Sequence, residues 1–89
     1  MQTHTTERFR KAFEHLPPEV QETARKAYSL WQQDPQHRSL QFKQIHSTKP
    51  IYSVRVSRGW RAVGVRQQDT MIWYWIGSHA EYDKLLTQL

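Results

Sequence analysis

The spacing of the apolar residues changes once along the chain, close to Asp34, and this change constrains the fold more than any other feature. Before Asp34, apolar side chains recur every three or four positions, as on the buried face of an amphipathic helix. After it, they alternate with polar side chains, as along a strand with one buried face. Helices followed by strands in this order indicate an α+β domain whose helices pack on an antiparallel sheet.

Two helices are expected before the change of spacing. A threonine of Thr5-Thr6 caps the first, and Glu7 lies near the positive end of its dipole. Pro17-Pro18 ends that helix and suits the first turn of the next one, which Asp34-Pro35 ends. The result is a helical hairpin whose apolar positions are Phe9, Ala12, Phe13, Leu16, Val20, Ala24, Ala27, Tyr28 and Trp31.

A sheet and a last short helix are expected after Asp34. Leu40 and Phe42 alternate in a first strand, and Ile45 is out of phase, which indicates a bulge or a strand end. The connections have hairpin length, so a meander of three or four antiparallel strands is predicted. The last helix leaves the sheet face opposite the hairpin open or half covers it. The other expected strands are 52–56, 60–65 and 70–76, and the expected helix is 79–89. The strand 70–76 is apolar on both faces, so it should lie in the interior of the sheet.

The turn between the second and third strands predicts which side chains share a face. A three-residue loop over 57–59, with Gly59 in the left-handed conformation, sets Arg55 directly across from Arg61. Like charges in that position destabilise a sheet, and an anionic ligand between them would remove the repulsion. Alternatively, both side chains extend into water. A loop of another length would turn Arg61 toward the core. The face toward the helices is expected to hold Val54, Val56, Trp60 and Ala62.

The bulk composition narrows the class of protein. The chain has 89 residues, enough for one domain over 1–89, and no cysteine, which excludes disulfides and cysteine-based zinc sites. Its 13 Lys+Arg against 8 Asp+Glu give a net charge of +5, which favours a nucleic acid or an acidic protein as partner, or marks an ordinary basic domain. No apolar run could span a bilayer and the start is polar, so we expect a cytoplasmic protein without a membrane partner.

Several other polar residues are candidates for chemistry or binding. His79 follows the last strand and could act as acid or base near neutral pH, or stand beside a helix cap without chemistry. Tyr82 is either part of the site or a packing residue of the last helix. Lys43, Lys49 and Arg58 are candidate RNA contacts or solvated charges. The five histidines lack metal-ligand spacing and no Gly-rich phosphate loop occurs, so neither a metal nor a cofactor is expected.

Three segments carry a resemblance to a known family. They are Tyr52–Val56 (YSVRV), Gly59–Val63 (GWRAV) and Trp75–Tyr82 (WIGSHAEY), in an order and spacing that resemble the sheet of the RelE/ParE toxin superfamily. Leu16-Pro17 and Asp34-Pro35 also match the limits of the helical hairpin in that superfamily. The likeness extends from about residue 7 to residue 86.

The resemblance implies a fold of two helices against a twisted antiparallel sheet. RelE-type members cut messenger RNA in the ribosomal decoding site, with the ribose 2′-hydroxyl as nucleophile and no metal. ParE-type members share the fold but inhibit DNA gyrase without catalysis. Both types are neutralised by a cognate antitoxin protein that wraps them, so the resemblance implies an antitoxin as partner here.

The resemblance also assigns roles to individual residues. Arg61 matches the arginine that steadies the scissile phosphate, and Arg55 occupies a strand position that is basic in some of these ribonucleases. His79 stands where relatives have an arginine or a histidine, and Tyr82 approximates a C-terminal tyrosine. Attack by a 2′-hydroxyl needs a base, an acid and cations for the charge on the phosphorane, and these residue types supply them.

Two departures from the family pattern accompany these matches. Ser53 falls where RelE has a lysine, and the N-terminal strand of the family is reduced to residues 2–5 or absent. The leading hypothesis is a toxin-like, ribosome-dependent messenger RNA endoribonuclease that a cognate antitoxin neutralises. The alternatives are a ParE-like inhibitor of DNA gyrase and a solitary, non-toxic binding module of the same fold.

Overall fold

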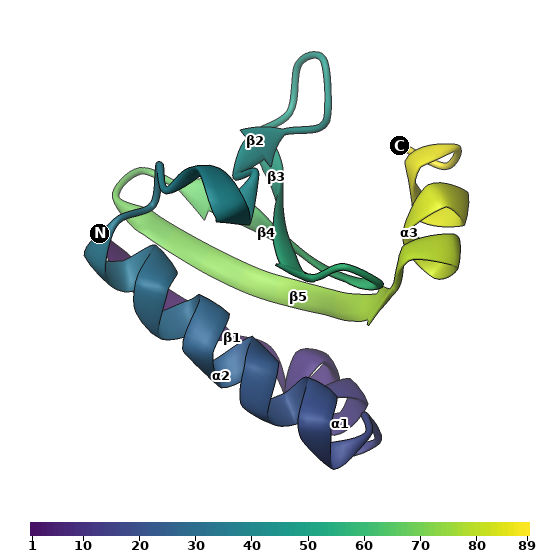
Figure 1. The fold of residues 1–89 in the computed structure, drawn as a ribbon. Helices are drawn as coiled ribbons and strands as arrows, with labels where there is room; N and C mark the ends of the chain where they lie inside the picture. The colour runs from purple at the N-terminus through teal and green to yellow at the C-terminus, as the bar shows by residue number, and fades with distance from the viewer.

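A computed structural model describes residues 1–89 and contains one five-stranded sheet and three α-helices (Figure 1). The strands lie in the order β1-β5-β4-β3-β2, and every neighbouring pair is antiparallel except β1 and β5, which are parallel. In chain order the elements are β1 (Gln2–Thr5), α1 (Glu7–Glu14), α2 (Pro18–Gln33), a 3₁₀ helix (Arg38–Leu40), β2 (Lys43–Gln44), β3 (Ile51–Ser57), β4 (Trp60–Gln67), β5 (Thr70–Ser78) and α3 (His79–Leu86).

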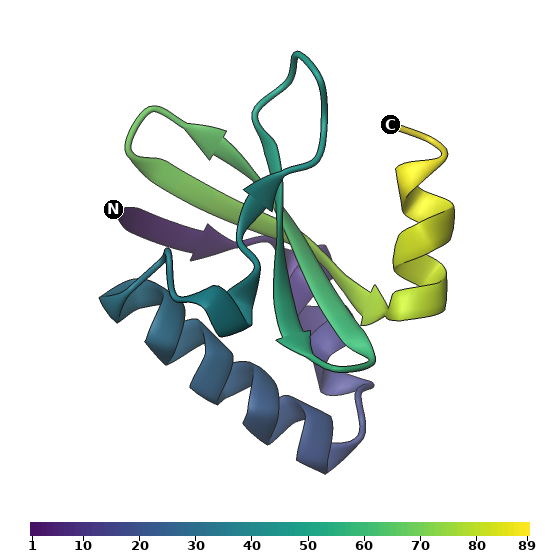
Figure 2. The same cartoon turned by 45° about the horizontal axis from the view of Figure 1, so that its top comes forward.

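The first two helices begin and end where the sequence predicts. Thr6 caps α1, and its hydroxyl accepts a hydrogen bond of 3.1 Å from the backbone N–H of Phe9. Pro18 opens α2, and Asp34 follows its last residue. Helix α1 packs against β5, whereas α2 packs against β3, and a short connection joins the two helices (Figure 2). The predicted helical hairpin is therefore confirmed.

Aromatic side chains build the core between α2 and one face of the sheet. Trp31 of α2 packs edge-on against Phe42 and Trp73, with ring centroids 5.6 and 5.3 Å away. Large rings compensate for the small number of residues that a domain of this size can bury. The core face of the sheet includes Val54, Val56, Ala62 and Ile76, and Trp60 packs against this cluster. The predicted orientation of the second and third strands is thus confirmed.

The β3–β4 hairpin reaches the predicted pairing through a different turn. Ser57 pairs with Trp60, so the loop has two residues rather than three, and Gly59 does not adopt the left-handed conformation. A β-bulge between Arg55 and Ser57 takes up the extra residue. Arg55 therefore still pairs with Arg61, because the bulge restores the register that a shorter loop would have shifted.

Two other expectations about the sheet are corrected. Residues 2–5 form the reduced N-terminal strand, which was one of the two alternatives expected, and its parallel pairing with β5 makes a mixed five-stranded sheet instead of three or four antiparallel strands. The strand expected at Leu40 and Phe42 does not form, because Leu40 ends a 3₁₀ helix and Gln41 takes a left-handed φ of 46°. Only Lys43–Gln44 pairs with β3 there. The interior position of β5 is confirmed, since it lies between β1 and β4.

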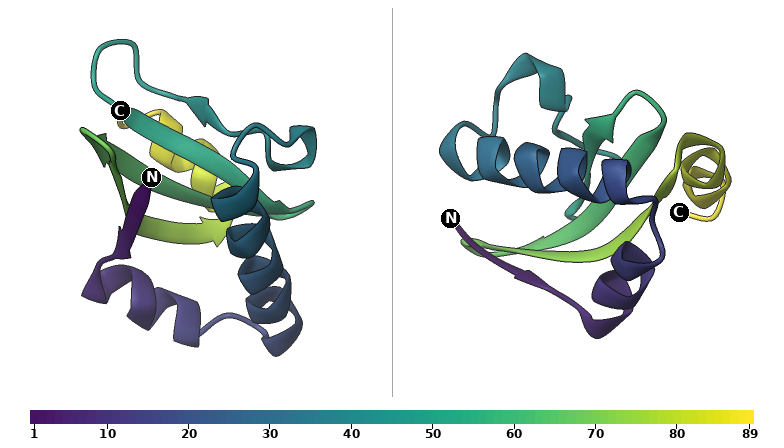
Figure 3. Two further views of the ribbon diagram at one scale, coloured as in Figure 1. Left: turned by 90° about the vertical axis from the view of Figure 1, so that its left-hand side faces the viewer. Right: turned by 60° about the horizontal axis from the view of Figure 1, so that its bottom comes forward.

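The short helix α3 covers part of the opposite face of the sheet (Figure 3). It follows β5 without a loop, with Ser78 as its N-cap. Ser78 and Glu81 form a capping box, in which each side chain accepts a hydrogen bond from the other residue's backbone N–H. None of the three α-helices combines the length and the apolar character that a membrane-spanning helix needs.

Candidate functional site

Cationic side chains occupy the face of the sheet that α3 partly covers. Arg55 of β3 pairs with Arg61 of β4, which in turn pairs with Gly77 of β5. On the neighbouring row, Lys43 of β2 pairs with Ser53 of β3. Because directly paired residues point to the same side of a sheet and so do alternate residues of one strand, Lys43, Arg55 and Arg61 share one face.

Tyr82 fixes α3 onto this face. Its ring is buried, and its hydroxyl donates a hydrogen bond of 3.0 Å to the buried Oγ of Ser53. The ring also lies 6.4 Å from that of Trp75, measured between centroids. A hydroxyl with a buried structural partner is not open to a substrate in this arrangement. The geometry therefore favours the packing role of Tyr82 over the catalytic one.

The turn between β3 and β4 braces the Arg61 side chain. Its Nη1 donates hydrogen bonds to the carbonyl oxygens of Ser57 at 2.8 Å and Trp60 at 2.9 Å, with a longer one of 3.4 Å to Arg58. Burial lowers the pKa of Arg61 from its ordinary value, and the neighbouring Arg55 guanidinium lowers it further. The bonded Nη1 fixes the guanidinium plane, and Nε and Nη2 make no hydrogen bond within the protein.

His79 is the first residue of α3 and stands next to the same turn. Its backbone N–H donates a hydrogen bond of 2.8 Å to the carbonyl oxygen of Gly59. Its Nδ1 lies 3.2 Å from a carboxylate oxygen of Asp83, and its ring meets that of Tyr82 edge-on, with centroids 5.9 Å apart. Since Arg61 pairs with Gly77, two residues before His79, the histidine and the arginine lie at the same end of the sheet.

The candidate RNA contacts are exposed but do not all gather at one place. Arg58 lies in the β3–β4 turn beside Arg61, and Lys43 lies on the cationic face next to Ser53. Lys49 belongs to the loop between β2 and β3, where its backbone N–H donates to Nδ1 of His46 at 2.9 Å. That loop lies at the opposite end of β3 from the turn (Figure 2). No three His, Asp or Glu side chains are grouped so that they could hold a metal ion.

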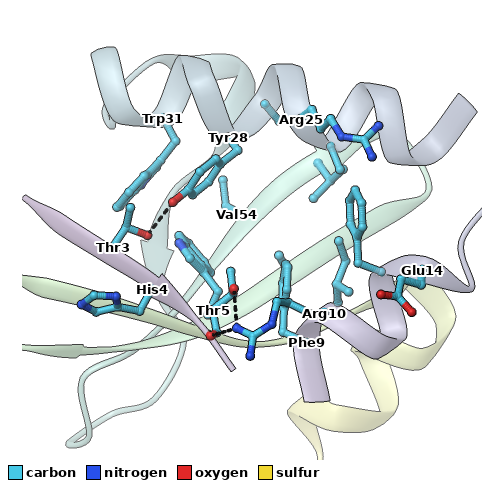
Figure 4. Close-up of a pocket in the computed structure, with 17 residues that line it drawn as sticks. Thr3, His4, Thr5, Phe9, Arg10, Glu14, Arg25, Tyr28, Trp31 and Val54 are labelled. Carbon is cyan, nitrogen blue, oxygen red and sulfur yellow. Dashed lines mark hydrogen bonds between the residues drawn. The ribbon is translucent and has the colours of Figure 1, made fainter. Parts of the chain in front are cut away.

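A second feature, an apolar groove, lies between the helices and the core face of the sheet (Figure 4). It has a volume of about 720 Å³, and its walls come from β1, α1, α2 and the three long strands. Arg10 and Arg25 line it among the apolar side chains. The indole N–H groups of Trp31 and Trp73, which also line it, are buried without a hydrogen-bond partner.

Sequence reasoning missed Asp83 and this groove. The four-residue spacing of His79 and Asp83 could have indicated the contact of Asp83, because side chains at that spacing meet on one face of a helix. No local pattern signals the groove, since it depends on how far α1 and α2 lie apart.

The chain matches a family model. Residues 18–84 match the model of the ParE-like toxin domain, which is most of the chain. No curated protein sequence is significantly similar to it.

Several solved structures share the fold at low sequence identity. A chain of the RelB–RelE antitoxin–toxin complex from Methanococcus jannaschii superposes with a TM-score of 0.72 at 16% identity, over 91% of this chain and 95% of that one. The isolated E. coli RelE toxin superposes with a TM-score of 0.66 at 16% identity, over 99% of this chain and 98% of that one. The YoeB/ParE toxin from Agrobacterium tumefaciens superposes with a TM-score of 0.68 at 12% identity, over 89% of this chain and 99% of that one. At these identities the likeness shows the fold.

Proposed function

The chain belongs to the ParE-like toxin family of the RelE/ParE toxin superfamily, and from this premise we propose that it is a toxin that cleaves messenger RNA on the ribosome. The observation that carries the proposal is the pairing of Arg55 with Arg61 at the end of the sheet where α3 begins with His79. Two cations side by side cost the sheet roughly 0.2–1 kcal/mol unless an anion separates them. A backbone phosphate of RNA is such an anion.

The residues present match the demands of the reaction. The 2′-oxygen forms a bond to phosphorus and loses its proton, while the bond from phosphorus to the 5′-oxygen breaks and that oxygen gains a proton. Arg61 and Arg55 stabilise the negative charge on the phosphorane, and the fixed guanidinium of Arg61 needs little reorganisation to do so. His79 accepts the proton of the 2′-hydroxyl through Nε2, the nitrogen that does not contact Asp83, and solvent water supplies the proton to the departing 5′-oxygen.

The other exposed cations bind the RNA backbone outside the reacting phosphate. Lys43 and Arg58 flank the cationic face on two sides, and Lys49 extends the charge along the β2–β3 loop. Such contacts hold a strand electrostatically and without sequence preference. The face is open rather than a deep pocket, so the ribosome would have to position the message for the chemistry.

The description of the matching family favours a second candidate, a ParE-like inhibitor of DNA gyrase without catalysis. Induction of the chain in bacteria, with mapping of RNA 5′ ends and measurement of plasmid supercoiling, separates the two. Cuts in translated messages within minutes of growth arrest support the ribonuclease. Loss of supercoiling without cuts supports the gyrase inhibitor, and unaffected growth supports a non-toxic binding module.

We further propose that a cognate antitoxin neutralises the protein and uses the apolar groove. A partner that inserts apolar side chains there would bury the exposed part of the groove lining. Arg10 and Arg25 outnumber the one carboxylate of the lining, Glu14, which favours acidic residues in the partner beside its apolar side chains. Titration of the antitoxin at rising salt should weaken binding, whereas salt-independent binding would show that charge contributes little.

A further inference from the structure

Asp83 has no role in the site as described above, although its side chain contacts a candidate catalytic residue. Its carboxylate is 3.2 Å from Nδ1 of His79, one turn earlier on α3. His79 has no second side-chain hydrogen bond, so Nε2 is free of partners within the protein. A carboxylate at one ring nitrogen of a histidine determines which nitrogen carries the proton when the ring is neutral. Here the proton would sit on Nδ1.

The imidazole is also held from two other directions. Its own backbone is tied to the β3–β4 turn by the 2.8 Å hydrogen bond to Gly59, and the edge-on ring of Tyr82 limits its rotation. Tyr82 in turn is fixed through Ser53. The imidazole therefore has contacts at Nδ1, at its ring and through its own backbone, and none at Nε2.

Asp83 also acts on the cationic pair. Its negative charge raises the pKa of Arg61, against the lowering by burial and by Arg55. The carboxylate is therefore within electrostatic reach of both the guanidinium and the imidazole. The side chains in contact with the His79 ring are those of Tyr82 and Asp83.

We infer that Asp83 is a positioning residue, whose carboxylate holds His79 in the Nδ1–H tautomer and presents Nε2 for proton transfer. The inference rests on the proposed ribonuclease function. Its physical basis is the pairing of a carboxylate with a histidine that is known from catalytic triads, in which the acid orients the base and does not itself react.

A purely structural role for Asp83 predicts different behaviour. An exposed pair at this spacing on a helix stabilises a protein only slightly, and both side chains are largely exposed, at 47% and 60%. If helix stability were its only effect, Asp83→Ala would resemble Glu22→Ala, which removes the carboxylate of the matched Glu22–Lys26 pair in α2. Glu22→Ala is therefore the control.

The first measurement is the tautomer of His79 by ¹⁵N NMR of the full chain at alkaline pH, where imidazoles are neutral. We expect Nδ1–H in the unmutated protein and in Glu22→Ala. In Asp83→Ala the proton should move to Nε2, which a neutral histidine prefers when it lacks a partner. Asp83→Glu should retain Nδ1–H, because a glutamate at this spacing can also reach the ring. Nε2–H in the unmutated protein, or the same tautomer in Asp83→Ala, would overturn the inference.

The second measurement is the rate of ribosome-dependent cleavage of a short message. Asp83→Ala should lower kcat about tenfold, a smaller loss than in a buried triad because this pair is exposed, and KM should not rise. A carboxylate that only repelled RNA would, when removed, lower KM and leave kcat unchanged, and that result would contradict the inference. If the unmutated protein cleaves no RNA, the proposed function fails, and the tautomer alone decides whether Asp83 positions His79.

Discussion

Replacement of Tyr82 by phenylalanine tests whether this residue fixes α3 or takes part in chemistry. The change removes one hydroxyl and keeps the ring that packs against Trp75. It deletes the 3.0 Å hydrogen bond to Ser53 and leaves a buried Oγ without a partner, since the exposed fractions of the two residues are 6% and 2%. Such a loss costs about 1–2 kcal/mol of unfolding free energy. For a domain of this size, each kcal/mol lowers Tm by roughly 4–8 °C.

The assay is thermal and urea unfolding of the purified protein, with a matched control. Tyr28→Phe deletes an equivalent hydroxyl, which donates a 3.1 Å bond to Thr3 at the surface, and should cost less than about 0.5 kcal/mol. Tyr82→Phe combined with Ser53→Ala should lose less than the sum of the single changes, because no buried oxygen is then left unpaired.

The same variants decide between the two roles. If Tyr82 only fixes the helix, Tyr82→Phe cleaves RNA at the unmutated rate at temperatures where it is folded. Unchanged stability together with lost cleavage would refute this reasoning and return the hydroxyl to the catalytic site.

Two further predictions concern the sheet and the start of α3. Gly64→Ala should destabilise the protein by about 1–3 kcal/mol, because a Cβ there would lie 2.8 Å from the backbone oxygen of Ile72, whereas Gly59→Ala, with nothing within 4 Å, should be neutral in the same unfolding assay. The hydrogen bonds from the backbone and side chain of Ser78 lower the pKa of Glu81. The stabilisation from this capping box is therefore complete above the ordinary glutamate pKa and is lost as the pH falls through the lowered one. The protection factors of the amides in the first turn of α3, which compare each exchange rate with its intrinsic rate at the same pH, should fall over that range, but not in Glu81→Gln.

Local patterns predicted the elements whose causes are local. Thr6, Pro18 and Asp34 mark the helix limits through capping and proline sterics, which depend on a few neighbouring residues. The alternation in β3 and β4 predicted their faces, and the pairing of Arg55 with Arg61 held although a bulge produced it. Strand periodicity thus predicted the register better than turn length did.

Long-range pairing accounts for what the sequence did not reveal. The strand Gln2–Thr5 is short and polar, and only its pairing with β5, some 70 positions away, makes it a strand. The 3₁₀ helix that ends at Leu40 buries this residue, which the expected strand would also have buried, so apolar character alone did not distinguish them. The hydrogen bonds of Arg61 depend on carbonyl oxygens of the β3–β4 turn, whereas a side chain free to bind an anion or water was expected. For Tyr82 a packing role was one of the two expectations, but its partner Ser53 lies on another element and had no local signal.

The most direct test of the central claim is cleavage of a translated message by the purified protein, with and without ribosomes. The account predicts cleavage only on the ribosome, a rate lower by roughly 10²–10³ in Arg61→Ala, and an unmutated rate in Arg66→Ala, a control in β4 whose side chain donates to the carbonyl of Gln68 in the next turn. Melting curves of each variant separate lost chemistry from lost folding. Full activity in Arg61→Ala, or no cleavage by the unmutated protein, would contradict the account.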